Sequence, residues 1–429
     1  MELVHKPGRM SRRTSRLAFM MTLPTVLIVL AIVVIPLLVT FWISFKPIEL
    51  GDLRPAEASG RIKVSRSEVA AFDVGGDPLS IEFFLKNTSR QFSVRDVTLT
   101  NDIPVGVDVV ALDERCQVDT VIRCQLGDYA PGFKESVFIK VAPNAQFDKA
   151  SFDAKASKPV MGGEGSNPLI VRPFTLDNFK DVFDIRGFWT ILTTTFVYTL
   201  GSTAAALTLG LLAALLLNRP FAGRGLFRGV MLVPYVAPVI AVAFTWIALL
   251  DPTSGALNAL LLQMGAVDRP VNFFADSALV FSLPGTDIKY NFTLALGTVI
   301  AFEGWRYFPL AFLFILARMQ SIPQDMYEAA DMDGASPFQK FWALTLPQLI
   351  GVMSVLFLLR FIWTFNKFDD IFLLTGGSAG TQTLTVEVYR QAFAISNLGG
   401  GAAVAVVIFV ILAAFSLLYF RSLPKDEGL

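Results

Sequence analysis

Charged and polar side chains interrupt two long apolar stretches in the second half of the chain. In the first stretch they recur at the three- and four-residue spacing that brings side chains onto one face of a helix. These residues are Glu303, Arg306, Tyr307 and, one turn further on, Leu310. In the second stretch the same spacing places on another face Arg360, Trp363, Thr364 and Lys367. Charges inside a membrane span are costly and usually face a cavity or a partner. The two groups are therefore candidates for a substrate path.

A structural role is the alternative for both groups. Their charged members would then form ion pairs, and Trp305 and Trp363 would be packing or interface residues. In a substrate path, the three cations would favour an anionic solute, although Glu303 would cancel one of them. The residue types leave these alternatives open.

The chain offers little material for catalysis. It has 429 residues but two cysteines and one histidine, His5, so neither a Cys/His zinc cluster nor a histidine-based triad can be assembled. Asp369 and Asp370 are a tempting acidic pair, but neighbours on a helix point about 100° apart. The sequence contains no Gly-rich Lys-Ser/Thr phosphate-binding loop. We expect no catalytic residues, no metal site and no cofactor, and the net charge of +0 implies no nucleic-acid partner.

The elements that must position the two groups are membrane spans. Hydrophobic residues make up 53% of the chain and gather in blocks of the roughly 20 residues that cross a bilayer. The first block, 17–45, is longer than a signal-peptide core of about 7–15 residues and lacks a small-residue cleavage site, which makes a cleaved signal the weaker alternative. The further blocks are approximately 188–217, 226–250, 292–317, 348–373 and 402–420. The expected fold is an all-α polytopic membrane protein with six transmembrane helices, five of them in a core at 187–421.

Lysine and arginine near the span ends set the orientation, because cytoplasmic loops are enriched in both. The N-terminus 1–16 and the tail 422–429 are predicted to be cytoplasmic. The loop after the second span is also basic, whereas the loop at 251–291 is not. The charge of the loop at 322–347 is mixed, so its cytoplasmic placement rests on the parity of the spans. Residues 46–186 then lie outside the plasma membrane.

Residues 46–186 have a different character from the spans. Apolar and polar residues alternate with strand periodicity between Gly- and Pro-containing turns, which predicts an inserted, β-rich extracytoplasmic domain. The segment 85–106 resembles an immunoglobulin-like β-sandwich repeat. A hairpin centred near Thr120 would bring Cys116 opposite Cys124, and the pair could form a disulfide outside the membrane. Two free thiols are the alternative.

The segment 322–347 has the punctuation of two short helices joined by a turn. Pro323 suits a helix start, and the acids that follow favour the positive end of the helix dipole. Gly334 suits a helix stop or tight turn, and Pro337 begins the second element. An Ala-Ala pair in the first helix would let a partner approach closely. An ordinary amphipathic connector is the alternative.

This segment resembles the EAA loop of ABC importer permeases, with its Glu-Ala-Ala run, a glycine four residues later and a Leu-Pro pair. The matching residues are Glu328, Ala329, Ala330, Gly334, Leu346 and Pro347. The resemblance continues over most of the second half of the chain, through the loop and kinked span at 218–238 and the segment 361–377. It is closest to the carbohydrate-uptake, maltose-type (MalF-like) permeases. The chain departs from that type in its six spans and in an insertion directly after the first, so the role of the outer domain stays open.

The resemblance implies a type I ABC importer fold and the permease subunit of a binding-protein-dependent importer in the bacterial inner membrane. The loop would be a coupling helix that docks on the ATPase, through Glu328, Ala329, Ala330, Asp333, Gly334 and Phe338. The implied partners are an ATPase dimer that binds the ATP, an extracytoplasmic solute-binding protein, membrane lipid and a second, MalG-like permease subunit, either another gene product or an identical chain. A secondary transporter and a membrane receptor with an outward sensory domain are the alternatives.

The resemblance also gives the two polar groups a substrate. Their positions match those that line the maltose site in maltose-type permeases. Aromatic faces stack on sugar rings, and charged groups hydrogen-bond hydroxyls. The implied function is inward movement of a sugar or sugar derivative by ATP-driven alternating access, whereas the identity and charge of the solute are left open.

Overall fold

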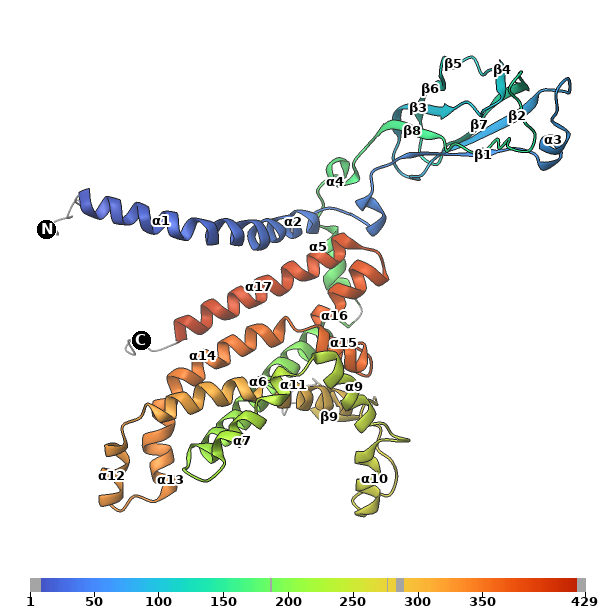
Figure 1. Cartoon of the computed structure of the whole chain (residues 1–429). Coiled ribbons are helices and arrows are strands. Elements are labelled where there is room, and N and C mark those ends of the chain that lie inside the picture. The colour runs from blue at the N-terminus through green and yellow to red at the C-terminus, as the bar shows by residue number, and fades with distance from the viewer. Residues whose placement is uncertain (1–8, 186, 276, 283–288, 423–429) are drawn as a thin grey trace. The chain divides into compact units, whose positions relative to one another are not determined.

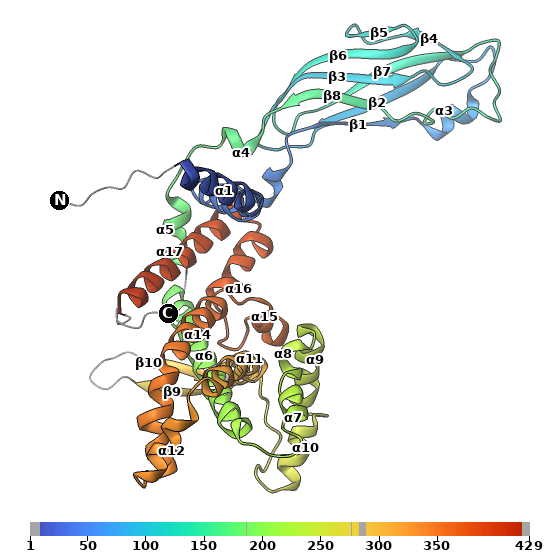
Figure 2. The same cartoon turned by 60° about the vertical axis from the view of Figure 1, so that its left-hand side comes forward.

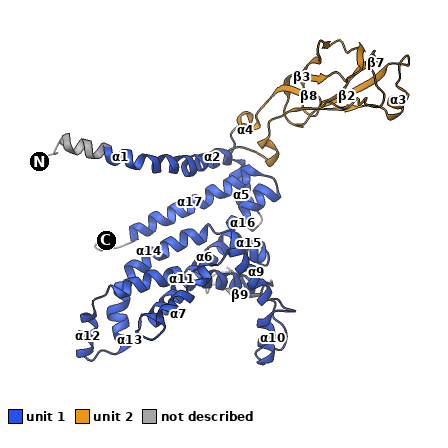
Figure 3. Cartoon of the chain, viewed as in Figure 1, with its two compact units in different colours: residues 1–45, 175–429 blue, residues 46–174 orange. Residues whose placement is uncertain are grey.

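The computed structural model describes residues 9–185, 187–275, 277–282 and 289–422, so His5 lies outside the described residues. The chain forms two compact units (Figure 3). The helical unit comprises residues 1–45 and 175–429, and the β unit comprises residues 46–174.

Within the described residues of the helical unit, five helices are long and apolar enough to cross a membrane (Figure 1). The first is a helix over Leu17–Ser44, formed by α1 (Arg9–Val29), a π-helical turn (Leu30–Val34) and α2 (Ile35–Ser44). The others are α6 (Phe188–Asn218), α11 (Leu294–Gln320), the continuous run Pro337–Phe365 that ends in α14 (Leu346–Phe365), and α17 (Leu398–Ser422). The bounds of these helices lie within a few residues of the predicted blocks, except that the run Pro337–Phe365 departs from the predicted block 348–373.

A sixth candidate span is broken. The predicted block 226–250 corresponds to α7 (Arg224–Val230), α8 (Val233–Val236) and α9 (Val239–Leu249). The helices on either side of Ala237 and Pro238 are bent by 93°. Proline cannot donate a backbone hydrogen bond and restricts the residue before it to extended conformations, which accounts for the break.

The predicted helical block 348–373 is wrong as a single helix. Helix α14 ends at Phe365, and a new short helix, α15 (Asp369–Thr375), begins after three residues. The chain continues through α16 (Leu384–Tyr389) and a π-helical turn (Arg390–Ala394) before α17. Two acidic residues in the first turn of α15 favour the positive end of its dipole, which supports a new helix start at this point.

Helices α6 and α11 form the centre of the helical unit because small residues let their backbones approach. A Cβ atom added at Gly210 of α6 would lie 2.8 Å from the backbone nitrogen of Phe312, and one added at Gly304 of α11 would lie 2.6 Å from the Cβ of Ala205. Close packing over small residues is how helices associate in a membrane. Helix α14 also packs on α6, and α17 packs on α2.

The remaining elements of the helical unit are short. They are α5 (Asp177–Asp184), α10 (Ala256–Gln263), β9 (Ala278–Ser282), β10 (Lys289–Thr293), α12 (Gln324–Met332) and α13 (Pro337–Lys340). Helices α7, α12 and α13 lie at one end of the unit, and α5, α15 and α16 lie at the other (Figure 1).

The β unit contains two antiparallel four-stranded sheets, in the orders β1-β2-β7-β4 and β5-β6-β3-β8 (Figure 2). The strands are β1 (Ala58–Lys63), β2 (Leu79–Asn87), β3 (Val94–Asp102), β4 (Val107–Ala111), β5 (Cys116–Val118), β6 (Val121–Tyr129), β7 (Lys134–Pro143) and β8 (Val160–Gly165). Buried and exposed residues alternate along β2, as they do in a strand with one face on a core. Apolar side chains from both sheets form one core.

Three further short elements belong to the β unit: a 3₁₀ turn (Leu50–Leu53), α3 (Arg66–Ala71) and α4 (Pro168–Val171). The unit ends at Phe174, before the predicted end at 186. Helix α5 falls instead in the helical unit, where Phe179 packs against Phe45 and the amide of Asn178 donates to the carbonyl of Ser44.

Strands β5 and β6 form a hairpin in which Cys116 pairs with Cys124 and Val118 with Ile122, with Thr120 at the turn. A disulfide joins the two cysteines, which lie in the core of the β unit.

Candidate functional site

The centre of the candidate site is a buried ion pair between two central helices. The Nη2 of Arg360 on α14 donates to the Oε1 of Glu303 on α11 over 2.7 Å, and the two side chains are 2% and 0% exposed. The other carboxylate oxygen of Glu303 has no hydrogen-bond partner among the described residues. The two residues thus form an ion pair, as the structural alternative predicts. This pairing leaves the second carboxylate oxygen of Glu303 unsatisfied.

Tyr307 joins this pair to a second charged group. Its ring lies 4.3 Å from the Arg360 guanidinium and 4.7 Å from the Lys367 ammonium, within the range of cation–π attraction. The ammonium of Lys367 also donates to the Tyr307 hydroxyl over 2.5 Å and lies 3.5 Å from the carboxylate of Asp370. Asp370 is fully buried, and neither of its carboxylate oxygens has a hydrogen-bond partner among the described residues. We call Glu303, Tyr307, Arg360, Lys367 and Asp370 the charged cluster.

Arg306, by contrast, binds backbone. Its guanidinium donates to the carbonyl of Ala237 over 3.0 Å and to that of Pro234 over 3.4 Å. These carbonyls lie at the break between α8 and α9, where they lack the partners that a continuous helix would give them. Arg306 therefore stabilises the bent span. Although it was predicted on the same helical face as Glu303, it donates to these carbonyls, whereas Glu303 pairs with Arg360.

The remaining predicted positions are dispersed. Thr364 is buried, and its hydroxyl has no partner among the described residues. Trp363 is 48% exposed, and Leu310 is half-buried. Lys367 lies beyond the end of α14, so the predicted common face with Arg360 is wrong: the chain turns after Phe365 and brings Lys367 back over Tyr307.

Sequence reasoning missed two features of this region. Asp370 was considered only as half of an acidic pair, yet it is a buried member of the charged cluster. Along α6, a seam of polar side chains is buried against the neighbouring helices: Thr194, Thr195, Tyr198, Thr199, Ser202 and Thr203. Four of these hydroxyls, on Tyr198, Thr199, Ser202 and Thr203, have no partner in the part of the chain that is described. Their repetition every fourth residue was the available signal.

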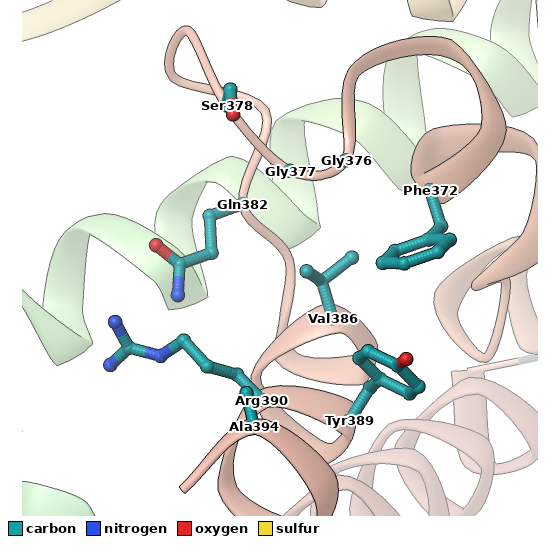
Figure 4. A pocket seen from close by; sticks show the side chains of 9 residues that line it. All are labelled: Phe372, Gly376, Gly377, Ser378, Gln382, Val386, Tyr389, Arg390 and Ala394. Atoms are coloured by element: carbon teal, nitrogen blue, oxygen red, sulfur yellow. The ribbon is translucent and has the colours of Figure 1, made fainter.

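A pocket of about 270 Å³ lies beside α15, which contributes Phe372 to its lining (Figure 4). Phe372, Val386 and Tyr389 form its apolar wall, whereas Gln382 and Arg390 lie opposite them. The backbone of a glycine-rich turn closes the pocket. Gly376 and Gly377 have φ values of +63° and +80°, a conformation that residues with a side chain rarely adopt.

A buried carboxylate fixes the polar wall of this pocket. Glu387, which is 1% exposed, accepts from Gln382 over 2.6 Å, from Gln391 over 2.7 Å and from Arg390 over 3.1 Å. An aromatic wall facing preorganised amide and guanidinium groups is suited to a hydroxylated ring, because rings stack on aromatic faces while hydroxyls need polar partners.

The loop 322–347 forms two helices joined by a turn, as its punctuation predicts. Helix α12 ends at Met332, Gly334 turns the chain with a φ of +73°, and α13 begins at Pro337. The ammonium of Lys340 donates to the carboxylate of Asp331 over 2.5 Å, which ties the two helices together.

The loop is also fixed to the spans that flank it. Tyr327 and Thr345 share a hydrogen bond of 2.9 Å between their hydroxyl groups. Arg318 at the end of α11 donates to the backbone and side chain of Gln348 on α14. Hydrogen bonds therefore hold the loop in a defined position against its flanking spans, and we call it the braced loop.

The outer surface of this loop exposes the predicted coupling residues. Glu328, Ala329, Asp333 and Gly334 are exposed, and Ala330 is half-buried. Three large apolar side chains beside them are mostly in solvent: Met332 is 89% exposed, Phe338 72% and Trp342 54%. The rings of Phe338 and Trp342 lie side by side, with centroids 6.0 Å apart, and exposed apolar side chains next to charged ones are typical of a protein interaction site.

A family model described as "binding-protein-dependent transport system inner membrane component" matches residues 206–425, which lie wholly within the helical unit. The inner membrane ABC transporter permease protein YcjO of Escherichia coli is 36% identical over 253 residues, or 59% of this chain and 80% of YcjO. The trehalose/maltose transport system permease protein MalF of Thermococcus litoralis is 35% identical over 254 residues, covering 58% of this chain and 80% of that protein. The trehalose transport system permease protein SugA of Mycobacterium tuberculosis is 30% identical over 57% of this chain and 73% of SugA.

A solved structure shares the fold. A chain of a bacterial alginate ABC transporter, crystallised with an alginate pentasaccharide-bound periplasmic protein, is similar with a TM-score of 0.52 and 20% identity, over 60% of this chain and 85% of that chain. The arrangement of the spans around α6 and α11 is thus one that ABC importer permeases use.

Proposed function

Because this chain belongs to the family of binding-protein-dependent transport system inner membrane components, we propose that it is the permease subunit of an ABC importer that moves a sugar or sugar derivative inward by ATP-driven alternating access. The observation that carries the proposal is the family match over 206–425, which includes both the braced loop and the charged cluster. The chain itself performs no ATP hydrolysis in this account. ATP is bound by a separate ATPase dimer.

The loop 322–347 is the proposed coupling element. Its apolar surface of Met332, Phe338 and Trp342 would enter a cleft of the ATPase, with Glu328 at the rim. Because α12 and α13 are tied to each other and to α11 and α14, a push on the loop would move two central spans together. That is the mechanical requirement for coupling at a distance.

A sugar-like solute is supported by two observations. Three relatives with substantial identity include two whose names specify trehalose, or trehalose and maltose, as the transported solute. The helical unit also presents an aromatic wall facing Gln382 and Arg390, and a charged cluster with an unsatisfied carboxylate oxygen. The solute would first enter the pocket that contains Gln382 and Arg390. It would then contact the predicted path residues, which are Glu303, Tyr307, Arg360, Thr364 and Lys367.

The membrane topology follows from the same proposal. The bent pair α7–α8 and α9 would be a sixth span, with the N- and C-termini and loop 322–347 in the cytoplasm. The β unit would lie outside the membrane, where a disulfide is stable. Its two sheets around one core are compatible with an immunoglobulin-like sandwich. A solute-binding protein and a second permease subunit would complete the importer.

The proposal is tested by co-expressing the tagged chain with candidate partners encoded beside it and recovering the complex. The test variant combines Glu328→Lys with Gly334→Asp, both on exposed positions of the loop. The matched control is Asp268→Lys, a charge reversal at an exposed position of the loop between α10 and β9.

Wild type and control should retain an ATPase and a second permease, whereas the loop variant should keep the permease and lose the ATPase. A chain that purifies alone and still supports transport would replace the importer with a secondary transporter. Equal retention of the ATPase by the loop variant would remove loop 322–347 from the account.

A further inference from the structure

One face of the sheet β1-β2-β7-β4 carries an excess of positive charge. The alternation of buried and exposed residues along β2 and β7 turns the side chains on this face away from the core of the β unit. Five cations belong to the face: Arg61, Lys63, Lys86, Lys134 and Lys140. The aromatic residues of this face are Phe84 and Phe138. Its acidic residue on strands β1, β2 and β7 is Glu82.

Three of these cations open into one cavity of about 380 Å³, a size typical of small-molecule sites. The residues that line the cavity are Ser59, Arg61, Phe84, Lys86 and Lys134. They come from three adjacent strands. Phe84 forms one wall of the cavity, and the Arg61 guanidinium and the Lys63 ammonium lie 4.9 and 4.1 Å from its ring centre.

The strand register places two of these cations directly opposite each other. Lys86 of β2 is paired with Lys134 of β7, and Ser59 of β1 is paired with Lys86 on the other side. Like charges directly opposite on neighbouring strands destabilise a sheet. None of the described carboxylates forms an ion pair with Arg61, Lys86 or Lys134. No ion pair among the described residues therefore offsets the repulsion between Lys86 and Lys134.

The acid on this face is already engaged. Glu82 accepts from the Ser136 hydroxyl over 2.6 Å and pairs with Lys63 at 3.3 Å. The hydrogen bond from Ser136, together with the nearby charges of Lys63 and Arg61, lowers the pKa of Glu82, so this carboxylate stays ionised at neutral pH. It does not line the cavity.

We propose that this cavity, bounded by Arg61, Lys86 and Lys134, binds a phosphate group, which we call the phosphate site. A phosphate carries up to two negative charges and three strong acceptor oxygens, one for each cationic side chain, whereas a carboxylate offers two oxygens. The hydroxyl of Ser59 is a fourth donor at the same place. The phosphate would come from a soluble phosphate monoester or from the monoester headgroup of phosphatidic acid, because a phosphodiester headgroup has only one charge and two terminal oxygens. This inference concerns the β unit alone and does not rest on the transport function.

The test uses the full-length chain in nanodiscs of neutral phosphatidylcholine, titrated with glycerol 3-phosphate and, in parallel, with glycerol. Binding is measured by calorimetry and by the shift of the thermal unfolding midpoint. The variant is Lys86→Gln with Lys134→Gln. The matched control is Lys140→Gln, which removes an exposed cation from the same face of β7 outside the cavity.

The wild type and Lys140→Gln should bind glycerol 3-phosphate and not glycerol. The double variant should bind at least about tenfold more weakly, because charge-assisted hydrogen bonds are the strong ones. Without ligand it should unfold at the same or a higher temperature, since its repulsion is removed. Absent binding by the wild type, or equal binding by the double variant, would overturn the proposal.

Anionic nanodiscs separate the two sources of phosphate. If nanodiscs that contain phosphatidic acid abolish the response of the wild type to glycerol 3-phosphate but leave that of a detergent-solubilised sample intact, the headgroup is the ligand. If the response persists in both, the ligand is a soluble ester.

Discussion

The charged cluster and loop 322–347 both contain acidic side chains, but the cluster buries them and the loop exposes them. In the cluster, Glu303, Arg360 and Asp370 are buried, and each finds partners of opposite charge inside the chain. In the loop, Glu328, Met332 and Phe338 are exposed. The difference teaches where the function of each lies. The cluster is held in place by the fold of one chain, whereas the proposed role of the loop surface requires a partner.

The comparison predicts that stability and coupling respond to different substitutions. Changes in the cluster should cost stability first, and changes in the loop should cost coupling with little effect on stability.

The largest effect is expected for Arg360→Met, which leaves Glu303 as a buried, unpaired charge. Breaking one side of a buried pair costs about 3–5 kcal/mol. The thermal unfolding midpoint in detergent should fall strongly. The double variant Glu303→Met with Arg360→Met should recover part of the loss. If the single variant unfolds like the wild type, the pair is not buried in the way described.

A smaller loss is expected for Arg306→Met, because this side chain satisfies the carbonyls of Pro234 and Ala237 at the break of the bent span. Hydrogen bonds to charged groups contribute about 1.5–3 kcal/mol. Limited proteolysis should cleave the segment 231–240 faster than in the wild type. Arg421→Met, at an exposed position near the end of α17, is the control. Unchanged cleavage would show that the break is stable without Arg306.

Lys340→Met should change stability little. Its partner Asp331 is 60% exposed, and exposed ion pairs contribute less than about 1 kcal/mol. Hydrogen exchange of α12 amides should nevertheless quicken, because the bridge between α12 and α13 is lost. Exchange as slow as in the wild type would mean that Tyr327 and Arg318 brace the loop on their own.

Phe338→Ala should leave the unfolding midpoint unchanged within about 0.5 kcal/mol, because its side chain is mostly in solvent. It should still weaken recovery of the ATPase, since apolar anchors dominate protein interfaces. Trp189→Ala, which removes a similarly exposed aromatic from the start of α6, is the control. Full recovery of the ATPase with Phe338→Ala would erase the contrast between the two regions.

The sequence was a good guide wherever the signal is local. Hydropathy predicted the spans, Pro323, Gly334 and Pro337 predicted the two helices of the loop, and strand alternation predicted a β-rich insertion with Cys116 opposite Cys124. The family resemblance was confirmed by the match over 206–425 and by relatives named as sugar permeases.

The sequence was a poor guide where the partners are distant. Apolar residues continue through 371–374, so hydropathy hides the end of α14 at Phe365. The residues Glu303 and Arg360 are 57 positions apart, and Arg306 reaches a carbonyl 72 positions away. Helical spacing can place such side chains on a face, but only packing decides which group each one meets.

The central claim is that the chain transmits ATP-driven motion through loop 322–347. The most direct measurement is ATP hydrolysis by the reconstituted importer, with and without its solute-binding protein, for the wild type, Gly334→Asp and the control Asp268→Lys. We predict that the binding protein stimulates the wild type and the control, whereas Gly334→Asp loses the stimulation. Its unfolding midpoint should fall only by what a side chain costs at the left-handed φ of +73°, about 1 kcal/mol, because Asp is one of the few residues that adopt this conformation. Undiminished stimulation of Gly334→Asp would contradict the account.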